Sequence, residues 1–548
     1  MPVACHRHSM FMNSGPQQEI VILGGGAAGW IAAALLAKKT YRHQTRITLV
    51  ESEEIGIIGV GEATVPVLAQ LNALLGIDEF DFIRRTQGTF KLGIEFCGWG
   101  VAGNRHFHAF SDYGHPVEGV PTHHYWLRVR QAGDDRPIDD YSFAYAVAKN
   151  NNFAPSDAPN SRYHHAYHFD AALYARYLRD VATALGVQRI EGKMTHVDLD
   201  GESGNITAIH LANGFTVAGD LFLDCSGFAS ELLGKALDTP FVDWSRWLLC
   251  NSAIAVPSKR TGAPTPFTRS TAHAGGWRWT IPLQHRSGNG MVYSSDFWSD
   301  DAARDALLAS IEGEPLAEPR LFRFTSGHRR QFWNRNCVGI GFASSFLEPL
   351  ESTGLQLIVM GVFKLLRYFP QPIIDPVLRD EYNRLSTCEI ERIRDFIIAH
   401  YYLSRRPEPL WSACRDIEIP DSLRHKLDVW SASGQIVLGD SESYGEPSWL
   451  AILLGNGVVP TRYDVSADLY PLEQIRTGMQ LRREEIVRSA QAIPSHQDFI
   501  DRHCKAQCTV VAAHAPDSDR IGPEARLRAA VESRLNPGMA NNSAEGIQ

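Results

Sequence analysis

Residues 19–39 read EIVILGGGAAGWIAAALLAKK, in which an apolar run leads through a glycine-rich turn into an alanine- and leucine-rich stretch. The pattern predicts a strand over Glu19–Leu23 and a helix over Ala27–Ala37, followed by a second strand over Arg46–Glu51. Two strands joined by a helix within about 30 residues form a β-α-β unit with parallel strands. We therefore expect the chain to begin with an α/β domain.

The turn itself, GGGAAG, has the glycine spacing of a dinucleotide-binding loop. Gly24 permits the tight turn, Gly26 lets the backbone approach a pyrophosphate closely, and Gly29 lets the helix pack on the strand. Ala27 and Ala28 begin the helix, whose free N–H groups face the phosphate charge. We expect these five residues to bind a dinucleotide cofactor.

An acidic residue closes the second strand of this unit. Glu51 lies 22 residues after Gly29, where its carboxylate can accept hydrogen bonds from a ribose diol. Because a carboxylate repels a 2′-phosphate, Glu51 favours FAD or NAD over NADP.

The composition is that of a globular protein. The chain has 548 residues, of which 44% are hydrophobic and 21% charged, and its net charge is −9. The acidic balance argues against a nucleic-acid partner, and no run approaches the roughly 20 apolar residues of a membrane span. The N-terminal residues lack the apolar core of a signal peptide, which predicts a cytoplasmic protein.

The cysteines and histidines indicate no metal site. The nine cysteines are dispersed and contain no CxxC pair, and the histidine pairs at 123–124 and 164–165 lack the i, i+4 spacing of a helical metal site. Reduced thiols and no metal ion are expected.

Further along the chain, strand-like segments come first and helix-like segments later. Strands are predicted over 190–198, 205–211, 215–223, 251–255, 277–283, 290–295 and 337–342, and helices over Leu355–Tyr368, Pro376–Leu403 and Leu423–Ser433. This order predicts an α+β fold built on the α/β start, with a mainly helical C-terminal part. Residues 1–17 are expected to be a disordered leader, and residues 513–548 a mobile tail with one helix over Pro523–Leu535.

Two segments resemble flavin-contacting segments of flavoprotein monooxygenases, namely DLFLDCSG at 220–227 and NCVGIGFA at 336–343. The resemblance implies FAD, bound by a core similar to those of glutathione reductase and hydroxybenzoate hydroxylase, and it places Phe342 and Leu355 among the FAD contacts. The sequence has no second GxGxxG motif for a nicotinamide. Reduced flavin is therefore expected from a separate NAD(P)H-dependent flavin reductase.

Four further segments occur together: GVGEATVP at 59–66, GTFK at 88–91, WRWTIP at 277–282 and EPLESTG at 348–354. Together they resemble the flavin-dependent tryptophan halogenase family, over roughly residues 19–465, with similar segments at Tyr167–Asp170 and Gly455–Pro460. The resemblance implies an enzyme that uses reduced flavin, O2 and chloride or bromide to form hypohalous acid. The acid would travel through the protein to a second site and halogenate an electron-rich aromatic compound.

The resemblance also implies roles for residues in these segments. Lys91 would hold the hypohalous acid, either as an ammonium that donates a hydrogen bond or as a haloamine. Glu351 would stabilise the arenium intermediate and take its proton, and Ser352 would hydrogen-bond into the same site. Thr353 and Gly354 would hold the halide through their backbone N–H groups.

Structural roles are the alternatives for several of these residues. Lys91 stands in an apolar segment, which favours a functional lysine over a solvated one. Glu351 is also suited to capping a helix that begins near Thr353. Trp277 and Trp279 either fill a core or separate the flavin from the substrate, so that hypohalous acid does not attack the wrong ring.

The expected substrate pocket carries part of the family's grip on free tryptophan. Family members that act on free tryptophan have a tyrosine pair, an acid and a Phe-Trp pair, whereas the corresponding segment here reads SYGEPSW at 443–449. Tyr444, Glu446 and Trp449 match in kind, and His108 and Phe110 are candidates for the pocket wall or for core packing. Because a partial grip lowers affinity for the zwitterion, indole, a substituted indole or a tryptophan within a larger molecule competes with free tryptophan.

These assignments divide the chain into two main parts. An FAD-binding domain over 18–370 includes an inserted substrate-side sheet, and a helical subdomain over 371–512 completes the substrate site. Two other functions are compatible with the same platform: hydroxylation of an aromatic ring, and FAD binding by a redox-responsive protein that does not halogenate. A monomer and a homodimer are equally open.

Overall fold

The computed structural model describes residues 18–40, 44–54, 61–155, 163–370 and 373–507. The described chain up to Ala506 belongs to one compact unit. The leader at 1–17, the tail at 513–548 with its predicted helix, and Gly59 and Val60 of the GVGEATVP segment lie outside the described residues. The domain boundary at 370 stays a prediction.

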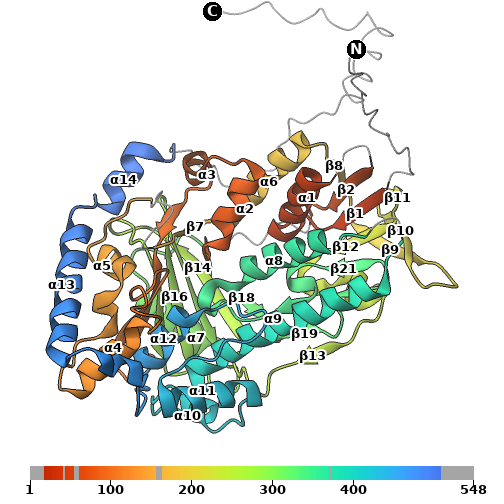
Figure 1. Cartoon of the computed structure of the whole chain (residues 1–548). Helices are drawn as coiled ribbons and strands as arrows, with labels where there is room; N and C mark the ends of the chain where they lie inside the picture. The colour runs from red at the N-terminus through yellow and green to blue at the C-terminus, as the bar shows by residue number, and fades with distance from the viewer. Residues whose placement is uncertain (1–17, 41–43, 55–60, 156–162, 371–372, 508–548) are drawn as a thin grey trace, which may run out of the picture. The chain divides into compact units, whose positions relative to one another are not determined.

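The predicted β-α-β unit is present in a six-stranded sheet (Figure 1). Helix α1 (Ala27–Lys39) connects the parallel strands β1 (Gln18–Leu23) and β2 (Thr45–Glu51). The strand order is β20-β21-β12-β1-β2-β8, and only the β20–β21 pair is antiparallel. The other strands are β8 (Gln188–Glu191), β12 (Leu221–Asp224), β20 (Trp333–Asn334) and β21 (Cys337–Gly339). Because α6 (Ala171–Ala184) and α8 (Thr353–Arg367) also pack on α1, that helix is buried on nearly every side.

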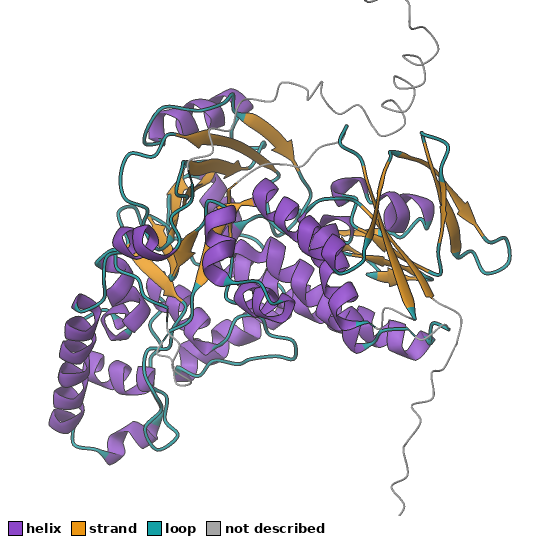
Figure 2. Ribbon diagram, turned by 90° about the horizontal axis from the view of Figure 1, so that it is seen from above, coloured by secondary structure: helices purple, strands orange, loops and turns teal. Residues whose placement is uncertain are grey.

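The WRWTIP run lies in a second sheet of seven strands, in a separate region of the unit (Figure 2). Its pairs are antiparallel except for β15–β5, and Trp277 lies between Ala272 and Val292 on the neighbouring strands. In sheet order the strands are β18 (Arg320–Arg323), β14 (Ser252–Ser258), β17 (Ser287–Tyr293), β16 (Gly276–Pro282), β15 (Thr268–His273), β5 (Gly93–Cys97) and β6 (Arg105–Ala109).

Three small sheets complete the strand structure. The first joins β3 (Gly61–Ala63), β7 (Ala166–Asp170) and β4 (Thr89–Lys91), so it carries Lys91 at a strand end. The second joins β11 (Thr216–Ala218), β10 (Ile206–Leu211) and β9 (Met194–Leu199), and the third β13 (Phe241–Asp243), β19 (Gly327–Arg329) and β22 (Ser345–Phe346).

Three predicted strands have different bounds in the structure. The segments 190–198 and 215–223 each divide into two strands, because the chain passes from one sheet to another at 192–193 and at 219–220. The segment 337–342 ends as a strand at Gly339 and continues as a turn over Gly341–Ala343. The other predicted strands are confirmed in type, with ends that differ by a few residues.

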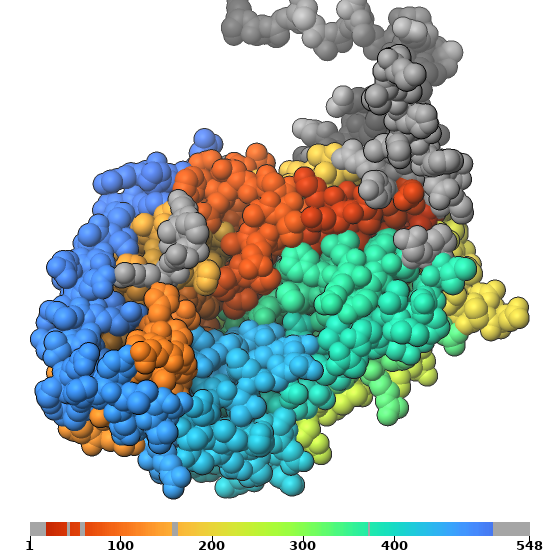
Figure 3. Space-filling model, viewed as in Figure 1, coloured from red at the N-terminus to blue at the C-terminus, as the bar shows by residue number. Residues whose placement is uncertain are grey.

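From α8 onward the described chain is mainly helical, as predicted. Helix α13 packs against α4 and α5, so the blue C-terminal surface lies beside the orange segment in Figure 3. Beyond α8 the helices are α9 (Pro376–Tyr402), α10 (Pro409–Arg415), α11 (Asp421–Ser433), α12 (Glu446–Gly455), α13 (Leu472–Gln491) and α14 (His496–His503). Before α8 they also include α2 (Val67–Leu75), α3 (Glu79–Arg85), α4 (Thr122–Gln131), α5 (Phe143–Lys149) and α7 (Asp300–Ser310). The architecture is mixed α/β with a mostly helical C-terminal region.

Candidate active site

The glycine turn lies between β1 and α1, against the end of β2. A methyl group on Gly29 would lie 1.9 Å from the carbonyl oxygen of Gly24, and one on Gly25 would overlap the Glu51 carboxylate. Gly26 instead faces open space, since a methyl group there would meet nothing within 4 Å. The turn therefore fits a pyrophosphate at Gly26, beside the N-terminus of α1.

Glu51 ends β2 beside this turn, at the position that the sequence predicts for a ribose-binding acid. Its carboxylate accepts a hydrogen bond from Trp30 Nε1 at 3.3 Å and forms an ion pair with the Arg189 guanidinium. Two donors thus hold the carboxylate at the end of the strand.

The two other predicted flavin segments pack against the glycine turn and α1. The DLFLDCSG segment forms β12, and the carbonyl oxygen of Cys225 would lie 2.3 Å from a methyl group on Gly24. In the NCVGIGFA segment, Gly341 has a left-handed backbone conformation, with a φ of 69°. A methyl group on Gly341 would lie 3.3 Å from the side chain of Ala28 and 3.1 Å from that of Ile358. Three segments far apart in the sequence therefore meet around the start of α1.

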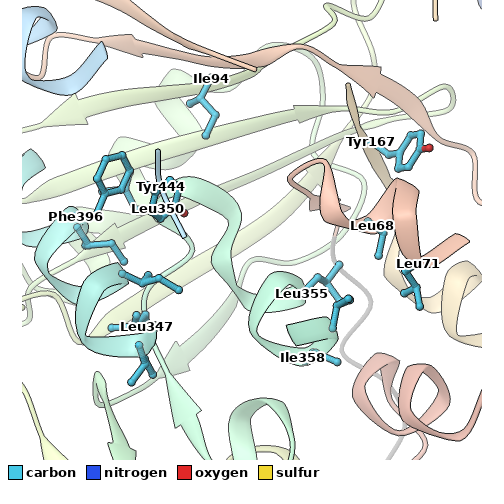
Figure 4. Close-up of a cluster of buried hydrophobic side chains, with 14 of the residues drawn as sticks. Leu68, Leu71, Ile94, Tyr167, Leu347, Leu350, Leu355, Ile358, Phe396 and Tyr444 are labelled. Carbon is cyan, nitrogen blue, oxygen red and sulfur yellow. The ribbon is translucent and has the colours of Figure 1, made fainter. Parts of the chain in front are cut away.

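Phe342 and Leu355 have different surroundings in this region. Phe342 is 38% exposed, and its ring stacks on that of Phe228 with centroids 4.9 Å apart. Leu355 is buried in the first turns of α8 and points toward α2 (Figure 4). Phe342 is therefore the more accessible of the two predicted flavin contacts.

Lys91, at the end of β4, is fully buried. Its Nζ donates hydrogen bonds to the Thr64 carbonyl oxygen at 2.8 Å and to Ser352 Oγ at 2.9 Å, and it lies 5.3 Å from the centre of the Phe110 ring. Burial lowers the pKa of Lys91 to about 7, and the negative charge of Glu351 opposes part of that shift. At neutral pH the side chain is divided between ammonium and free amine.

Glu351 is also buried, and two histidines hold its carboxylate. Oε2 lies 2.7 Å from His108 Nδ1, and Oε1 lies 3.0 Å from His400 Nε2. Burial alone would raise the pKa of Glu351, but the two imidazoles outweigh it and hold that pKa well below its usual range. The carboxylate therefore stays ionised beside Lys91.

The backbone turns sharply at this carboxylate. Glu351 and Ser352 both have left-handed conformations, with φ of 67° and 61°, which cost on the order of 1–3 kcal/mol each for residues other than glycine. The turn directs Ser352 Oγ to Lys91 and starts α8 at Thr353 with no side-chain cap. Because the carboxylate of Glu351 binds His108 and His400 instead, the helix-capping alternative is wrong.

The first turn of α8 has the chemistry of an anion site. Thr353 is fully buried, and its Oγ1 has no hydrogen-bond partner within the described structure. A methyl group on Gly354 would touch only the edge of Phe342, at 3.7 Å. The N–H groups at the start of a helix lack intrahelical acceptors, so Thr353 and Gly354 fit a small anion such as a halide.

Three further elements contribute side chains to the cluster around Glu351. His108 comes from β6, Phe396 from α9 and Tyr444 from the loop before α12. Tyr444 donates a hydrogen bond to the Glu351 carbonyl oxygen at 3.3 Å, and its ring stacks on Phe396 with centroids 3.9 Å apart (Figure 4). The structure thus brings together Lys91, Glu351, Ser352, His108, Phe110 and Tyr444 of the predicted site.

Glu446 and Trp449 have partners of their own. Glu446 Oε1 lies 3.5 Å from His123 Nδ1. Trp449 is fully buried, with its ring beneath Lys426 at 4.2 Å and its Nε1 donating to Glu442 at 3.3 Å. These contacts do not place either side chain against the Lys91–Glu351 pair.

The two tryptophans of the WRWTIP run also differ. Trp277 is buried, and its Nε1 donates to Oε1 of Glu348, which is also buried, at 3.0 Å. Trp279 is half-buried and packs with Ala63 of β3 and with Ile281. Core packing explains Trp277, whereas both interpretations remain for Trp279.

The sequence did not indicate a role for two contributors to the site. His400 lies on α9, 49 residues after Glu351 in the sequence, and the packing of that helix brings its ring to the Glu351 carboxylate. Nothing in the local sequence indicates this contact. Ser448 stands in the SYGEPSW segment, where its hydroxyl lies 2.9 Å from His108 Nε2.

The described ranges contain no group of three or more His, Cys, Asp or Glu side chains placed to hold a metal ion. Among the helices of the described ranges, none is long and apolar enough to span a membrane.

Together, the fold and the site define a nucleotide-binding protein in which a buried amine, a buried carboxylate and the start of a helix meet. Known proteins are similar to this chain along most of its length. The pattern of the tryptophan halogenase family matches residues 19–471. RebH, a tryptophan 7-halogenase of Lentzea aerocolonigenes, is 35% identical in an alignment of 484 positions that covers 82% of this chain and 91% of RebH.

Solved structures agree. Xcc4156, a flavin-dependent halogenase from Xanthomonas campestris, is 43% identical with a TM-score of 0.88, over 90% of this chain and all of the other. BrvH, a flavin-dependent halogenase from Brevundimonas sp. BAL3, is 42% identical with a TM-score of 0.86, over 89% of this chain and 99% of the other. The chain belongs to the tryptophan halogenase family and is a flavin-dependent halogenase of aromatic substrates. Membership implies FAD and a flavin reductase as the usual partner, and it confirms the resemblance drawn from the sequence.

Proposed function

We propose that the protein uses reduced FAD, O2 and chloride or bromide to form hypohalous acid, which Lys91 holds for the halogenation of an indole-type ring. The observation that carries this proposal is the Lys91 amine, which is buried between Thr64 and Ser352 and has a pKa of about 7. A lysine in this state serves as a hydrogen-bond donor or as a nucleophile. An ionised carboxylate, that of Glu351, belongs to the same cluster.

FAD would lie along the glycine turn and the first turn of α1, with Glu51 at its ribose. The neighbouring contacts would come from Ala27, Ala28, Phe342 and Leu355. Reduced FAD together with O2 supplies the oxidising power that converts a halide into hypohalous acid. The halide would lie at Thr353 and Gly354, where a buried hydroxyl without a partner and the helix N-terminus fit it.

Lys91 would present the halogen to the ring, and Glu351 would remove the ring proton. The Lys91 ammonium donates to the oxygen of the hypohalous acid, or the free amine carries the halogen as a haloamine. The ring attacks the halogen, so that a carbon–halogen bond forms as the oxygen–halogen bond breaks, and the oxygen takes the ammonium proton and leaves as water. In the haloamine route, water leaves when the amine reacts with the hypohalous acid, and the nitrogen–halogen bond then breaks while the nitrogen takes up a proton. Glu351 then takes the ring proton, and the C–H electron pair returns to the ring. Because His108 and His400 already hold the carboxylate in place, this step needs little reorganisation.

An indole or an indole derivative is the proposed substrate. The groups expected to grip free tryptophan are engaged elsewhere: the Tyr444 hydroxyl on the Glu351 carbonyl, Glu446 on His123, and the Trp449 ring in the core. A zwitterion that enters without such partners loses the hydration of its charges, which lowers its affinity.

The test is a reconstituted reaction read by mass spectrometry. Purified protein, FAD, a generic NADH-dependent flavin reductase, O2 and bromide are incubated with indole or with tryptophan. We expect the bromine isotope pattern in the indole product, with kcat/KM for indole at least about tenfold above that for tryptophan. A hydroxylated product in halide-free buffer would instead indicate ring hydroxylation. FAD binding without any product from an indole panel would indicate the redox-responsive protein.

A further inference from the structure

Four side chains form a continuous hydrogen-bonded chain through the Glu351 carboxylate. His400 Nε2 lies 3.0 Å from Oε1, and His108 Nδ1 lies 2.7 Å from Oε2. On its far side, His108 Nε2 lies 2.9 Å from Ser448 Oγ. The chain joins α9, the turn before α8, β6 and α12.

The two hydrogen-bond partners of His400 indicate where its ring carries a proton. Its Nδ1 lies 2.8 Å from the Phe396 carbonyl oxygen, which only accepts, so Nδ1 carries a proton. Its Nε2 faces the Glu351 carboxylate, which also only accepts while it is ionised. Both ring nitrogens of His400 thus face oxygen atoms, which hold the ring between Phe396 and Glu351.

The two partners of His108 favour one neutral tautomer of its ring. Its Nδ1 faces an accepting carboxylate oxygen at 2.7 Å and must donate. A neutral imidazole with a proton on Nδ1 has only a lone pair on Nε2, and a lone pair needs a donor. The Ser448 hydroxyl, at 2.9 Å, is able to donate to it.

We propose that Ser448 is a positioning residue, whose hydroxyl donates to His108 Nε2 and thereby holds the ring with its Nδ1–H directed at Glu351. In the opposite tautomer, His108 would present a lone pair to a carboxylate oxygen at 2.7 Å, and the two would repel. The neighbour of a functional imidazole or carboxylate often fixes its proton in this way. The catalytic part of the proposal rests on the proposed function of Glu351 as the proton acceptor.

Other titratable groups also face Glu351. Lys91 approaches from β4, His106 from β6 and Tyr444 from the loop before α12. Burial lowers the pKa of His106 to about 3 and raises the pKa of Tyr444 well above its ordinary value, so both stay neutral near pH 7. Among these neighbours, His108 is the one that links Ser448 to the carboxylate.

The test compares Ser448→Ala with Ser448→Thr, which keeps a hydroxyl. The first measurement is 15N NMR of the histidine rings in the substrate-free protein, with the His108 signals assigned by their loss in His108→Gln. We expect a protonated Nδ1 and a bare Nε2 for His108 in all three proteins, and in Ser448→Ala alone the Nε2 resonance should move to the higher 15N shift of a lone pair without a hydrogen bond. An unchanged His108 signal in Ser448→Ala would overturn the proposal.

The second measurement is the pH profile of indole halogenation. Ser448→Ala should lower kcat by about tenfold to a hundredfold with little change in KM, which is the usual effect of removing such a neighbour. The acidic limb of the profile should move to higher pH, because a His108 ring that Ser448 no longer holds donates less well to Glu351 and favours its ionised form less. Ser448→Thr should restore both. A wild-type kcat in Ser448→Ala would refute the catalytic part. The NMR result needs no turnover, so it decides the Ser448–His108 contact even if wild type halogenates nothing.

Discussion

Replacing Lys91 with methionine, which has a similar length and no charge, tests the state of the buried amine. The pKa of Lys91 is about 7 in the folded protein, compared with 10.5 ordinarily. Between these values the unfolded chain binds one more proton than the folded protein, so the contribution of Lys91 to stability rises with pH. Between about pH 6.5 and about pH 8.5, the free energy of unfolding of wild type should rise by about 2 kcal/mol relative to Lys91→Met.

The assay is urea unfolding, followed by tryptophan fluorescence, of both proteins at several pH values. Other titrating groups are common to the two proteins and cancel in the difference. Lys38→Met is a matched control that removes an exposed lysine at the end of α1. A pH-dependent difference of the same size in that variant would show that loss of a lysine, and not burial of the amine, causes the effect. If the Lys91→Met difference is constant across the range, the amine titrates near its ordinary value and the reasoning fails.

Four further substitutions test other parts of the structure. Burial raises the pKa of Glu348 from 4.5 to about 7, so between these values the folded state binds more protons. Wild type should therefore lose about 3 kcal/mol of stability relative to Glu348→Gln as pH rises through that range, and a constant difference in urea unfolding would contradict this. Gly26→Ala should keep the thermal midpoint of the FAD-free protein but weaken FAD binding at least about tenfold in a fluorescence titration. By contrast, Gly29→Ala should lower the midpoint itself, because its methyl group overlaps the backbone. Glu446→Gln should change kcat/KM for indole by less than about twofold, because the carboxylate lies on His123; a tenfold loss would place it in the substrate site.

Local sequence patterns were sufficient to predict the start of the fold. The apolar strand, the glycine spacing and the alanine-rich helix of residues 19–39 all act within one β-α-β unit, and the structure contains that unit. The strands predicted over 190–198 and 215–223 were only partly right, because each crosses from one sheet to another. A local pattern indicates extended backbone but not its partner strand.

The candidate site was predictable to the extent that its residues lie in recognisable segments. Lys91, Glu351 and Ser352 each lie in such a segment, and the structure brings them together. His400 lies in the middle of a long helix, and its contact with Glu351 depends on how α9 packs. Trp277 donates a hydrogen bond to Glu348, which lies 71 residues further along the chain, and no spacing in the sequence indicates this pairing.

The most direct test of Lys91 as the halogenating residue is the product spectrum of Lys91→Met in the reconstituted bromide reaction. FAD binding is measured in parallel, and a soluble phenol is added as a scavenger of hypohalous acid. We expect brominated indole to fall below about 1% of the wild-type yield, since a residue that acts only at the reacting atoms contributes a factor of this order. FAD binding should be unchanged, and brominated phenol should appear in its place. Brominated indole at the wild-type rate from Lys91→Met would show that the buried amine does not carry the reaction.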